Sequence, residues 1–480
     1  MRTKKIIKNY ISLIGTTIGI ILFSTFIENN HYRLEAKSYE KKIKTSKATT
    51  TIKRDRVKKR SKRKKTALPK RKVNNHTMLL QKKEPDETWL TIFVHGIISA
   101  TPVLSIRTMR QIGKDQVKGT YYQKYVQNVR KDSFFCRNQP MQSLGLQKVD
   151  MSRKDAADGS PALAHIFEKQ SQWLHKDKKI NNYYYTFGWS GLLSYKKRYQ
   201  DAIKLFKAVY KEVEQFNKRG IKPKVRIVGF SHGASVCINM AKVKRQEKLP
   251  CNFFVDEMIL LGMPVQANTD YLTFDPLFKR IYNFYSKLDR VQVMDFSAPG
   301  KLLSNRLLRN SRKFPLPDSL VQVKFELLRK TTTKKRKDKK RTPRHSVSVR
   351  NSSPGHCEWW FFGWTNKFYR KNFGIKPLSL VSIIPTVIHG INETNLKGTK
   401  TKLVGNHIKV SVRPYDQIIV LRSKKDRKVA QFLTAQQLEQ LKDIAKSFPF
   451  KKISDEQYHT KVQEKLNLAQ KQFNSEQNKS

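Results

Sequence analysis

Short apolar runs alternate with amphipathic stretches from about residue 88 to the end of the chain. Runs of β-branched and aromatic residues that are bounded by Gly, Pro or polar residues predict strands. The clearest runs are 88–94, 183–187, 225–228, 258–264 and 280–286. Residues 199–216 instead carry apolar side chains at the spacing of one helix face. Strands that alternate with helices predict an α/β fold, with a mostly parallel sheet covered by helices on both faces.

Two regions extend this pattern. The connection 97–180 is long for a link between strands, so we expect it to contain helices and to cover the site as a lid. Beyond residue 373, the runs 408–412 and 417–421 predict two strands. Thr434 and Gln437 have the spacing of a capping box that opens a helix. We interpret 373–480 as an appended module or an extension of the sheet, a small C-terminal α+β region whose role the sequence does not assign.

The N-terminus differs in character from the rest of the chain. A basic start precedes an apolar run over residues 10–27, which is typical of an export signal. We interpret residues 1–27 as an uncleaved signal anchor, with a cleaved signal peptide as the alternative. Residues 28–85 are polar and basic without periodicity, which predicts a disordered linker. The folded domain is expected over 86–372, in a membrane-anchored or exported protein of the cell envelope.

Charge adds one feature to this picture. The formal net charge is +61, and 13 of the 20 positions from 53 to 72 are Lys or Arg. A second basic block forms an insertion at about 330–345. Such blocks repel themselves and stay extended, and they attract anionic surfaces. We expect an anionic membrane as the partner and no specific nucleic acid, because the blocks lack the interleaved aromatic residues of stacking surfaces.

The four cysteines do not point to a metal site. They stand at positions 136, 237, 251 and 357, and none forms a C-x-x-C pair. If the chain is exported, disulfides are permitted, and the sequence does not choose among the three possible pairings.

The candidate chemistry centres on the stretch 225–235. It runs from a strand through Gly229-Phe230-Ser231-His232-Gly233 into small and apolar residues of a predicted helix. A sharp strand-to-helix turn of this kind exposes a serine hydroxyl as a nucleophile. A Cβ at either glycine is expected to collide with the neighbouring strand or helix. The similar Gly188-Trp189-Ser190-Gly191 is one residue short, so we interpret Ser190 as a turn or pocket residue.

A nucleophilic serine needs a base within hydrogen-bonding reach and an acid that orients the base. The best downstream acid is Asp289, which follows the apolar run 280–286, with Asp295 and Asp256 as alternatives. The best base is His356, which follows a plausible last strand at 345–350 by a turn. His345 and His389 are the alternatives for the base, and His389 comes after the sheet is expected to be complete.

An oxyanion would need two backbone N–H donors. We expect these from His232, directly after the nucleophile, and from Ile97, in the loop after the first strand. The His95 side chain is expected to brace that loop and not to react.

Four stretches carry a family resemblance: Phe93-Val94-His95-Gly96, the Gly-x-Ser-x-Gly stretch, Tyr285-Ser286-x-x-Asp289 and Pro354-Gly355-His356. Together they resemble the α/β-hydrolase superfamily, in its lipase and esterase-like branch. The resemblance covers about residues 87–364. It implies cleavage of a carboxylic ester through an acyl-enzyme, with no metal and no organic cofactor. The basic insertion, the export segment and the C-terminal region depart from the family pattern.

Two functions follow from the sequence. The first is a serine hydrolase acting on esters, with lipid esters favoured by the aromatic residues around the site. Those aromatic residues are equally explained as core. The second is a non-catalytic hydrolase-fold scaffold that binds anionic lipid or another polyanion, because a fold alone does not fix an activity.

Overall fold

The computed structural model describes residues 87–97, 106–247, 253–266, 269–293, 304–309, 316–334, 345–363, 373–401 and 405–478. The described residues all belong to one compact unit, Asp86–Ser480. The expected signal segment over 1–27 and the linker over 28–85 lie outside the described residues.

One sheet forms the centre of the unit Asp86–Ser480. Its strands lie in the order β12-β11-β10-β7-β6-β5-β4-β1-β3-β2, while β8 pairs with β7 and β9 pairs with β10. The seven strands from β10 to β3 in this order pair in parallel, and all other pairs are antiparallel. The strands are β1 (Glu87–Val94), β2 (Gly145–Lys148), β3 (Ile180–Gly188), β4 (Lys224–Phe230), β5 (Glu257–Leu261), β6 (Ile281–Tyr285), β7 (Leu320–Lys334), β8 (His345–Ser352), β9 (Thr399–Thr401), β10 (Gly405–Arg413), β11 (Ile418–Arg422) and β12 (Arg427–Gln431).

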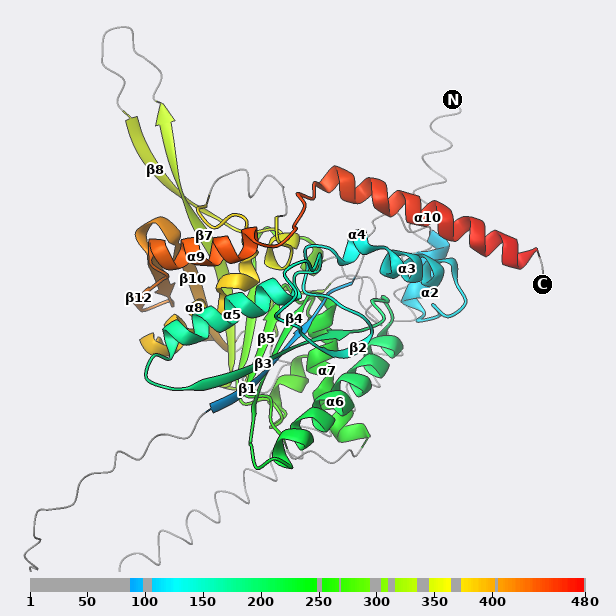
Figure 1. Cartoon of the computed structure of the whole chain (residues 1–480), viewed down its shortest axis with the longest axis horizontal. Helices are drawn as coiled ribbons and strands as arrows, with labels where there is room; N and C mark the ends of the chain where they lie inside the picture. Colours follow the sequence, from blue (N-terminus) through cyan, green and yellow to red (C-terminus); the bar gives the residue numbers. More distant parts are fainter. Residues whose placement is uncertain are drawn as a thin grey trace, which may run out of the picture. The chain divides into compact units, whose positions relative to one another are not determined.

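Helices cover both faces of this sheet (Figure 1). The α-helices are α2 (Ile106–Gly113), α3 (Tyr121–Lys131), α4 (Ser133–Cys136), α5 (Ser160–Leu174), α6 (Tyr195–Asn217), α7 (His232–Gln246), α8 (Ile384–Thr394), α9 (Ala435–Lys446) and α10 (Asp455–Gln477). Short 3₁₀ helices lie at Asp270–Phe274, Val291–Val293, Cys357–Trp359, Leu380–Ile383 and Pro414–Asp416. The predicted α/β architecture, with a mostly parallel sheet between helices, is therefore confirmed.

Side chains along each central strand point alternately to the two faces of the sheet, so the core has one part on each face. In β4, Val225 and Ile227 pack with α6 and α7, whereas Val228 packs with α5 and α8 on the other face. Side chains that point alternately to opposite faces, both apolar, are the mark of a strand buried on both sides. This explains why these strands read as continuous apolar runs in the sequence.

The long connection between β1 and β3 does contain helices, as predicted. It holds α2 to α5 and the short strand β2. Within it, α5 packs against β3, α8 and α9, and α3 packs along α10. The lid role expected for this connection stays a prediction.

The sheet is not complete at β8, which corrects the sequence-based interpretation of 345–350 as the last strand. β8 is the antiparallel partner of the distal half of β7, and this hairpin extends away from the sheet (Figure 1). The next strand of the sheet is β10, from the C-terminal region, which pairs in parallel with β7 over residues 321–327. Residues 373–480 therefore contribute β9 to β12 to the same sheet. Residues 335–344, most of the basic insertion, lie outside the described residues.

Local signals set the boundaries of the last two helices. The Thr434 side chain and Gln437 form the predicted capping box at the start of α9, and Ser454 and Gln457 form another at α10. Each box satisfies two backbone N–H groups that a helix start leaves without partners.

In the described part of the chain, no helix has the length and apolar character needed to cross a membrane. Cys136 and Cys237 are free thiols, and Cys251 lies outside the described residues.

Candidate active site

The site begins at the turn between β4 and α7. Ser231 has φ 53° and ψ −129°, and α7 starts at the next residue. A positive φ is costly for a residue with a side chain and persists only where the surrounding structure imposes it. A Cβ on Gly229 would lie 2.7 Å from Ala234 Cα in α7, and one on Gly233 would lie 2.1 Å from the His95 carbonyl oxygen after β1. The steric role predicted for both glycines is confirmed.

Three predicted side chains come together at this turn. The His356 ring lies with Nε2 2.9 Å from Ser231 Oγ and with Nδ1 2.8 Å from Asp289 Oδ2. The three residues come from the ends of β4, β6 and the segment after β8. A ring placed this way can accept the serine proton at Nε2 while the carboxylate fixes the proton on Nδ1.

Asp289 is held firmly in the loop after β6. Its side chain is fully buried, and Oδ1 accepts a hydrogen bond from the Gln292 backbone N–H at 3.2 Å. The Arg306 guanidinium donates two hydrogen bonds to the Asp289 carbonyl, at 2.8 and 3.1 Å. These bonds fix which carboxylate oxygen faces His356.

Three supporting residues were missed in the sequence. Gly262 follows β5 with φ 60°, and a Cβ there would lie 3.1 Å from Asp289 Oδ2 and 3.4 Å from the His356 ring. Its position directly after an apolar strand was the one signal available. Gln292 and Arg306 carried no signal, because each acts through contacts that only the folded chain creates.

The alternative candidates lie elsewhere. Asp256 accepts from the Val225 backbone N–H and pairs with Lys279, near the amino ends of β4 and β5. His389 is in α8 and pairs with Glu393. Ser190 donates its hydroxyl to Asp201 at 2.6 Å, as expected of a turn residue. His345 begins β8, at the far end of the hairpin from His356, and Asp295 lies outside the described residues.

The backbone near Ser231 has the placement expected of an oxyanion site. Gly96 lies so close that a Cβ on it would be 2.9 Å from Ser231 Cβ, and Ile97 is the next residue. His232 is the first residue of α7, and its Nδ1 lies 2.6 Å from Arg198 Nη1. A helix start directs backbone N–H groups and a partial positive charge toward this point. The donor roles of the Ile97 and His232 amides stay predictions.

His95 ties the end of β1 to the loop after β3. Its Nδ1 donates to the Gly96 carbonyl at 2.6 Å, and its Nε2 accepts from the Trp189 backbone N–H at 3.3 Å. The Trp189 indole N–H donates back to the His95 carbonyl at 2.6 Å. Burial, and then the nearby Arg130 charge, lower the pKa of His95 to about 3. The neutral ring is the form that satisfies both bonds, so this histidine stabilises the loop in its uncharged state.

The buried His95 leads to a prediction about stability in acid. Below its ordinary pKa of 6.5, the unfolded chain binds a proton at this residue, while the folded chain does not bind one until about pH 3. Its contribution is therefore fully present above pH 6.5 and is lost as the pH falls, by about 2 kcal/mol between pH 7 and pH 5. We expect His95→Gln to reduce the pH dependence of the unfolding free energy by about that amount, measured by urea titration at both pH values.

The matched control is His459→Gln, because His459 is exposed on α10. This variant is expected to keep the wild-type pH dependence. An equal reduction in both variants would contradict the assignment to His95.

The serine hydroxyl is covered in this conformation. Ser231 is 1% exposed, although the turn was expected to expose it. The Phe230 ring lies 4.8 Å from the His356 ring and stacks on Trp360 at 5.3 Å, and the Gly96 backbone contacts Ser231. A substrate therefore reaches Ser231 only after neighbouring groups move.

Most of the aromatic residues around the site are core. Trp189, Trp359, Trp360, Phe361 and Phe362 are all buried, four of them in the cluster that includes α5 and α8. Of the two explanations that the sequence left open, core packing accounts for these five. Trp364 lies outside the described residues.

Comparison with known proteins adds no assignment. No protein-family model matches the chain, and no curated protein is similar enough to match it. Among the described residues, no group of three or more His, Cys, Asp or Glu side chains is placed to hold a metal ion.

Proposed function

We propose that this protein is a serine hydrolase of the α/β-hydrolase type that cleaves carboxylic esters. The observation that carries the proposal is the pair of hydrogen bonds at His356, 2.9 Å to Ser231 and 2.8 Å to Asp289. The order of the three residues along the chain, Ser, Asp and then His, is that of the α/β-hydrolases. General-base activation of a serine requires a hydroxyl oxygen at one ring nitrogen of the histidine and a carboxylate oxygen at the other.

In the proposed mechanism, Ser231 Oγ attacks the ester carbonyl carbon while its proton passes to His356 Nε2. Asp289 keeps the proton on Nδ1 and stabilises the imidazolium that forms. The backbone N–H groups of Ile97 and His232 would bind the developing oxyanion. His356 then donates its proton to the leaving alcohol, which gives an acyl-enzyme. Water, activated by the same ring, releases the acid and restores Ser231.

The substrate class is proposed as carboxylic esters, including lipid esters. The support for lipid is the sequence of the N-terminal part, since an apolar segment and a basic linker would keep the chain at an anionic membrane. The protein is accordingly proposed to act at the cell envelope, anchored or exported. The buried aromatic residues no longer argue for lipid, because their burial is explained by the core.

The alternative, a scaffold that binds a polyanion without catalysis, is less well supported. A scaffold would have no use for the positive φ at Ser231, which costs energy unless the serine must be placed at that point. Nor would it need Gln292 and Arg306 to hold Asp289 in register with His356.

The test is reaction of the full chain with a fluorophosphonate probe, which modifies only activated serines. We expect rapid labelling of the wild type and none of Ser231→Ala, because the probe bonds to that Oγ. Labelling with added detergent allows for the covered state of Ser231. p-Nitrophenyl esters of increasing chain length, offered in anionic and in neutral vesicles, then separate esterase from lipase activity.

Ser190→Ala is the matched control, since Ser190 lies in the similar stretch but bonds to Asp201. It is expected to label like the wild type. A folded wild type that does not label with or without detergent would refute the hydrolase proposal and favour the scaffold.

A further inference from the structure

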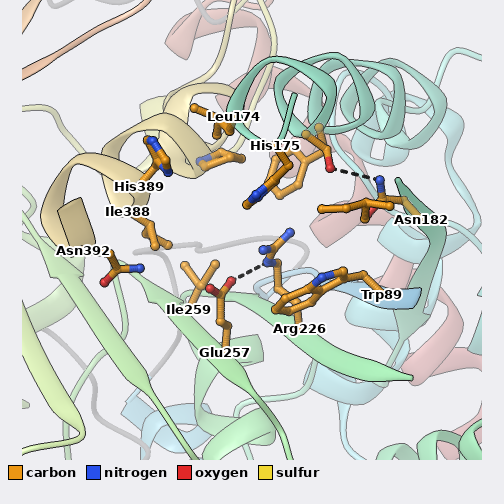
Figure 2. A pocket seen from close by; sticks show the side chains of 14 residues that line it. Trp89, Leu174, His175, Asn182, Arg226, Glu257, Ile259, Ile388, His389 and Asn392 are labelled. Atoms are coloured by element: carbon orange, nitrogen blue, oxygen red, sulfur yellow. Dashed lines mark hydrogen bonds and ion pairs between the residues drawn. The ribbon is translucent and has the colours of Figure 1, made fainter. Parts of the chain in front are cut away.

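A cavity lies near the amino ends of the central strands, whereas Ser231 lies at their carboxyl ends. It has a volume of about 80 Å³ and is enclosed by the amino-terminal parts of β1, β3, β4 and β5 together with α5 and α8 (Figure 2). Arg226, in its floor, and Ser231 belong to the same strand-and-turn segment, five residues apart. At about 3.3 Å per residue, they are about 16 Å apart. The cavity is therefore separate from the candidate active site.

The floor of the cavity presents an arginine with donors to spare. Arg226 Nε donates to Glu257 Oε2 at 2.6 Å, and the guanidinium lies 4.5 Å from the Trp89 ring. These two contacts fix the plane of the group. Figure 2 shows the outer end of the guanidinium directed into the cavity, toward His175. Within the described residues, no hydrogen bond is seen for its two terminal nitrogens. A fixed guanidinium with open donors suits an oxyanion, which it can bind through two parallel hydrogen bonds.

Two histidines lie across from this arginine. His175 directly follows α5, and its ring lies 6.3 Å from that of His389 in α8, edge to face. His389 Nε2 is held by Glu393 at 2.8 Å. An N–H group of the His175 ring, at Nδ1 or Nε2, can donate a hydrogen bond to an anion that lies between His175 and Arg226. Glu257 is the one acidic residue in the lining, and its charge is matched by Arg226.

The rest of the wall combines apolar and polar side chains. Ser171, Asn182 and Asn392 are polar, and each already makes a side-chain hydrogen bond within the protein. Leu174, Ile180, Ile259 and Ile388 are aliphatic. A cavity needs about 10–15 Å³ to hold one water molecule, so this one has room for a ligand of several non-hydrogen atoms. A short amphipathic anion matches this lining. Its charged end would lie between Arg226 and His175, and its apolar end would lie against the four aliphatic side chains. A bare inorganic ion would leave the aliphatic part of the wall unused.

We propose that this cavity binds a small aliphatic carboxylate, whose carboxylate group pairs with Arg226 and His175. The proposal does not depend on the hydrolase activity, because none of the residues involved belongs to the Ser231 site.

Binding is expected to be linked to protonation of His175. Burial is the first cause that lowers the pKa of His175, followed by the nearby His389 and Arg226, while Glu87 and Glu257 raise it by less. A bound carboxylate would add a negative charge beside the ring and favour its protonated form. The carboxylate should therefore bind more tightly at pH 6 than at pH 8, with uptake of a proton.

The test is calorimetric titration of the full chain with butyrate at both pH values, beside 1-butanol and inorganic phosphate. We expect butyrate to bind, more tightly at pH 6, and 1-butanol to bind much less. Arg226→Met should weaken butyrate binding by about tenfold or more, which is the loss expected for a hydrogen-bonded charge pair. Because Arg226 is distant from Ser231, butyrate bound at the active site would not respond to this change.

The matched control is Lys224→Met. Lys224 lies two residues earlier on β4, pairs with Glu87 and has its Nζ 5.4 Å from the centre of the same tryptophan ring, but it does not line the cavity. It is expected to bind butyrate like the wild type. If Arg226→Met does not fold, His175→Gln decides, because it should abolish the pH dependence of binding.

Three results would overturn the proposal. They are butyrate affinity that is unchanged in a folded Arg226→Met, the absence of butyrate binding, and binding of phosphate in place of butyrate. The last result would assign the cavity to an inorganic oxyanion. Ser231 labelling would be unaffected by any of them, so this proposal and the hydrolase proposal can fail separately.

Discussion

Asp289→Asn is expected to lower kcat for ester hydrolysis by about 10⁴-fold, because it reverses the tautomer of His356. The Gln292 backbone N–H donates to Oδ1, so an asparagine would place its oxygen there and turn its NH₂ group toward His356. Nδ1 would then have to accept, and the ring proton would move to Nε2. A ring that already carries a proton on Nε2 cannot take one from Ser231.

The measurement is kcat on a p-nitrophenyl ester, with Asp256→Asn as the control. Asp256 is also a largely buried carboxylate of this sheet, but it pairs with Lys279 near the amino ends of the strands. Its replacement is expected to cost stability and to leave kcat unchanged. A folded Asp289→Asn protein whose kcat stays within about tenfold of the wild type would contradict the role proposed for Asp289.

Gly233→Ala is expected to have the largest effect on stability, a loss of about 3 kcal/mol or more in the free energy of unfolding. The added Cβ would lie 2.1 Å from the His95 carbonyl oxygen and 2.8 Å from that of Val94. Both obstacles are backbone atoms, one in the last residue of β1 and one in the residue after it, so no side-chain rotation relieves the overlap. The end of β1 or the start of α7 has to move, and each carries part of the site.

Urea denaturation of the variant and the wild type measures this loss. Gly113→Ala is the control, because Gly113 is at the end of α2 and a Cβ there would meet no atom within 4 Å. We expect its unfolding free energy to stay unchanged or to rise by up to about 1 kcal/mol. Equal changes in the free energy of unfolding of the two variants would contradict the prediction that the close approach of α7 to β1 excludes a Cβ at Gly233.

The strands of the sheet could be predicted because their residues are buried on both faces. β1, β3, β4, β5 and β6 each read as an apolar run that is bounded by polar or small residues. The helix α6 could be predicted because one face alone is apolar, with Ala202, Leu205, Phe206, Val209 and Val213 all buried. In both cases, the local pattern and the final environment agree.

The end of the sheet could not be predicted in the same way. The sequence suggested that β8 was the last strand, because it preceded a turn and a candidate histidine. β10 takes the place beside β7 instead, and β8 pairs with the part of β7 that extends beyond it. Strand order depends on which edges meet in space, and nothing in the local sequence of β8 or β10 records that choice.

The sequence by itself determined the α/β pattern, the turn at Ser231 and the candidate partners Asp289 and His356. These follow from short-range rules: strand burial, glycines where a Cβ would collide, and the order of residues along the chain. Only the tertiary structure decided that Asp289 and not Asp256 meets His356, that Gln292 and Arg306 hold Asp289, and that Ser231 is covered. It alone assembled the cavity around Arg226 and His175. The reason is physical: each of these depends on contacts between residues far apart in sequence, and those distances are fixed only when the sheet and its helices pack.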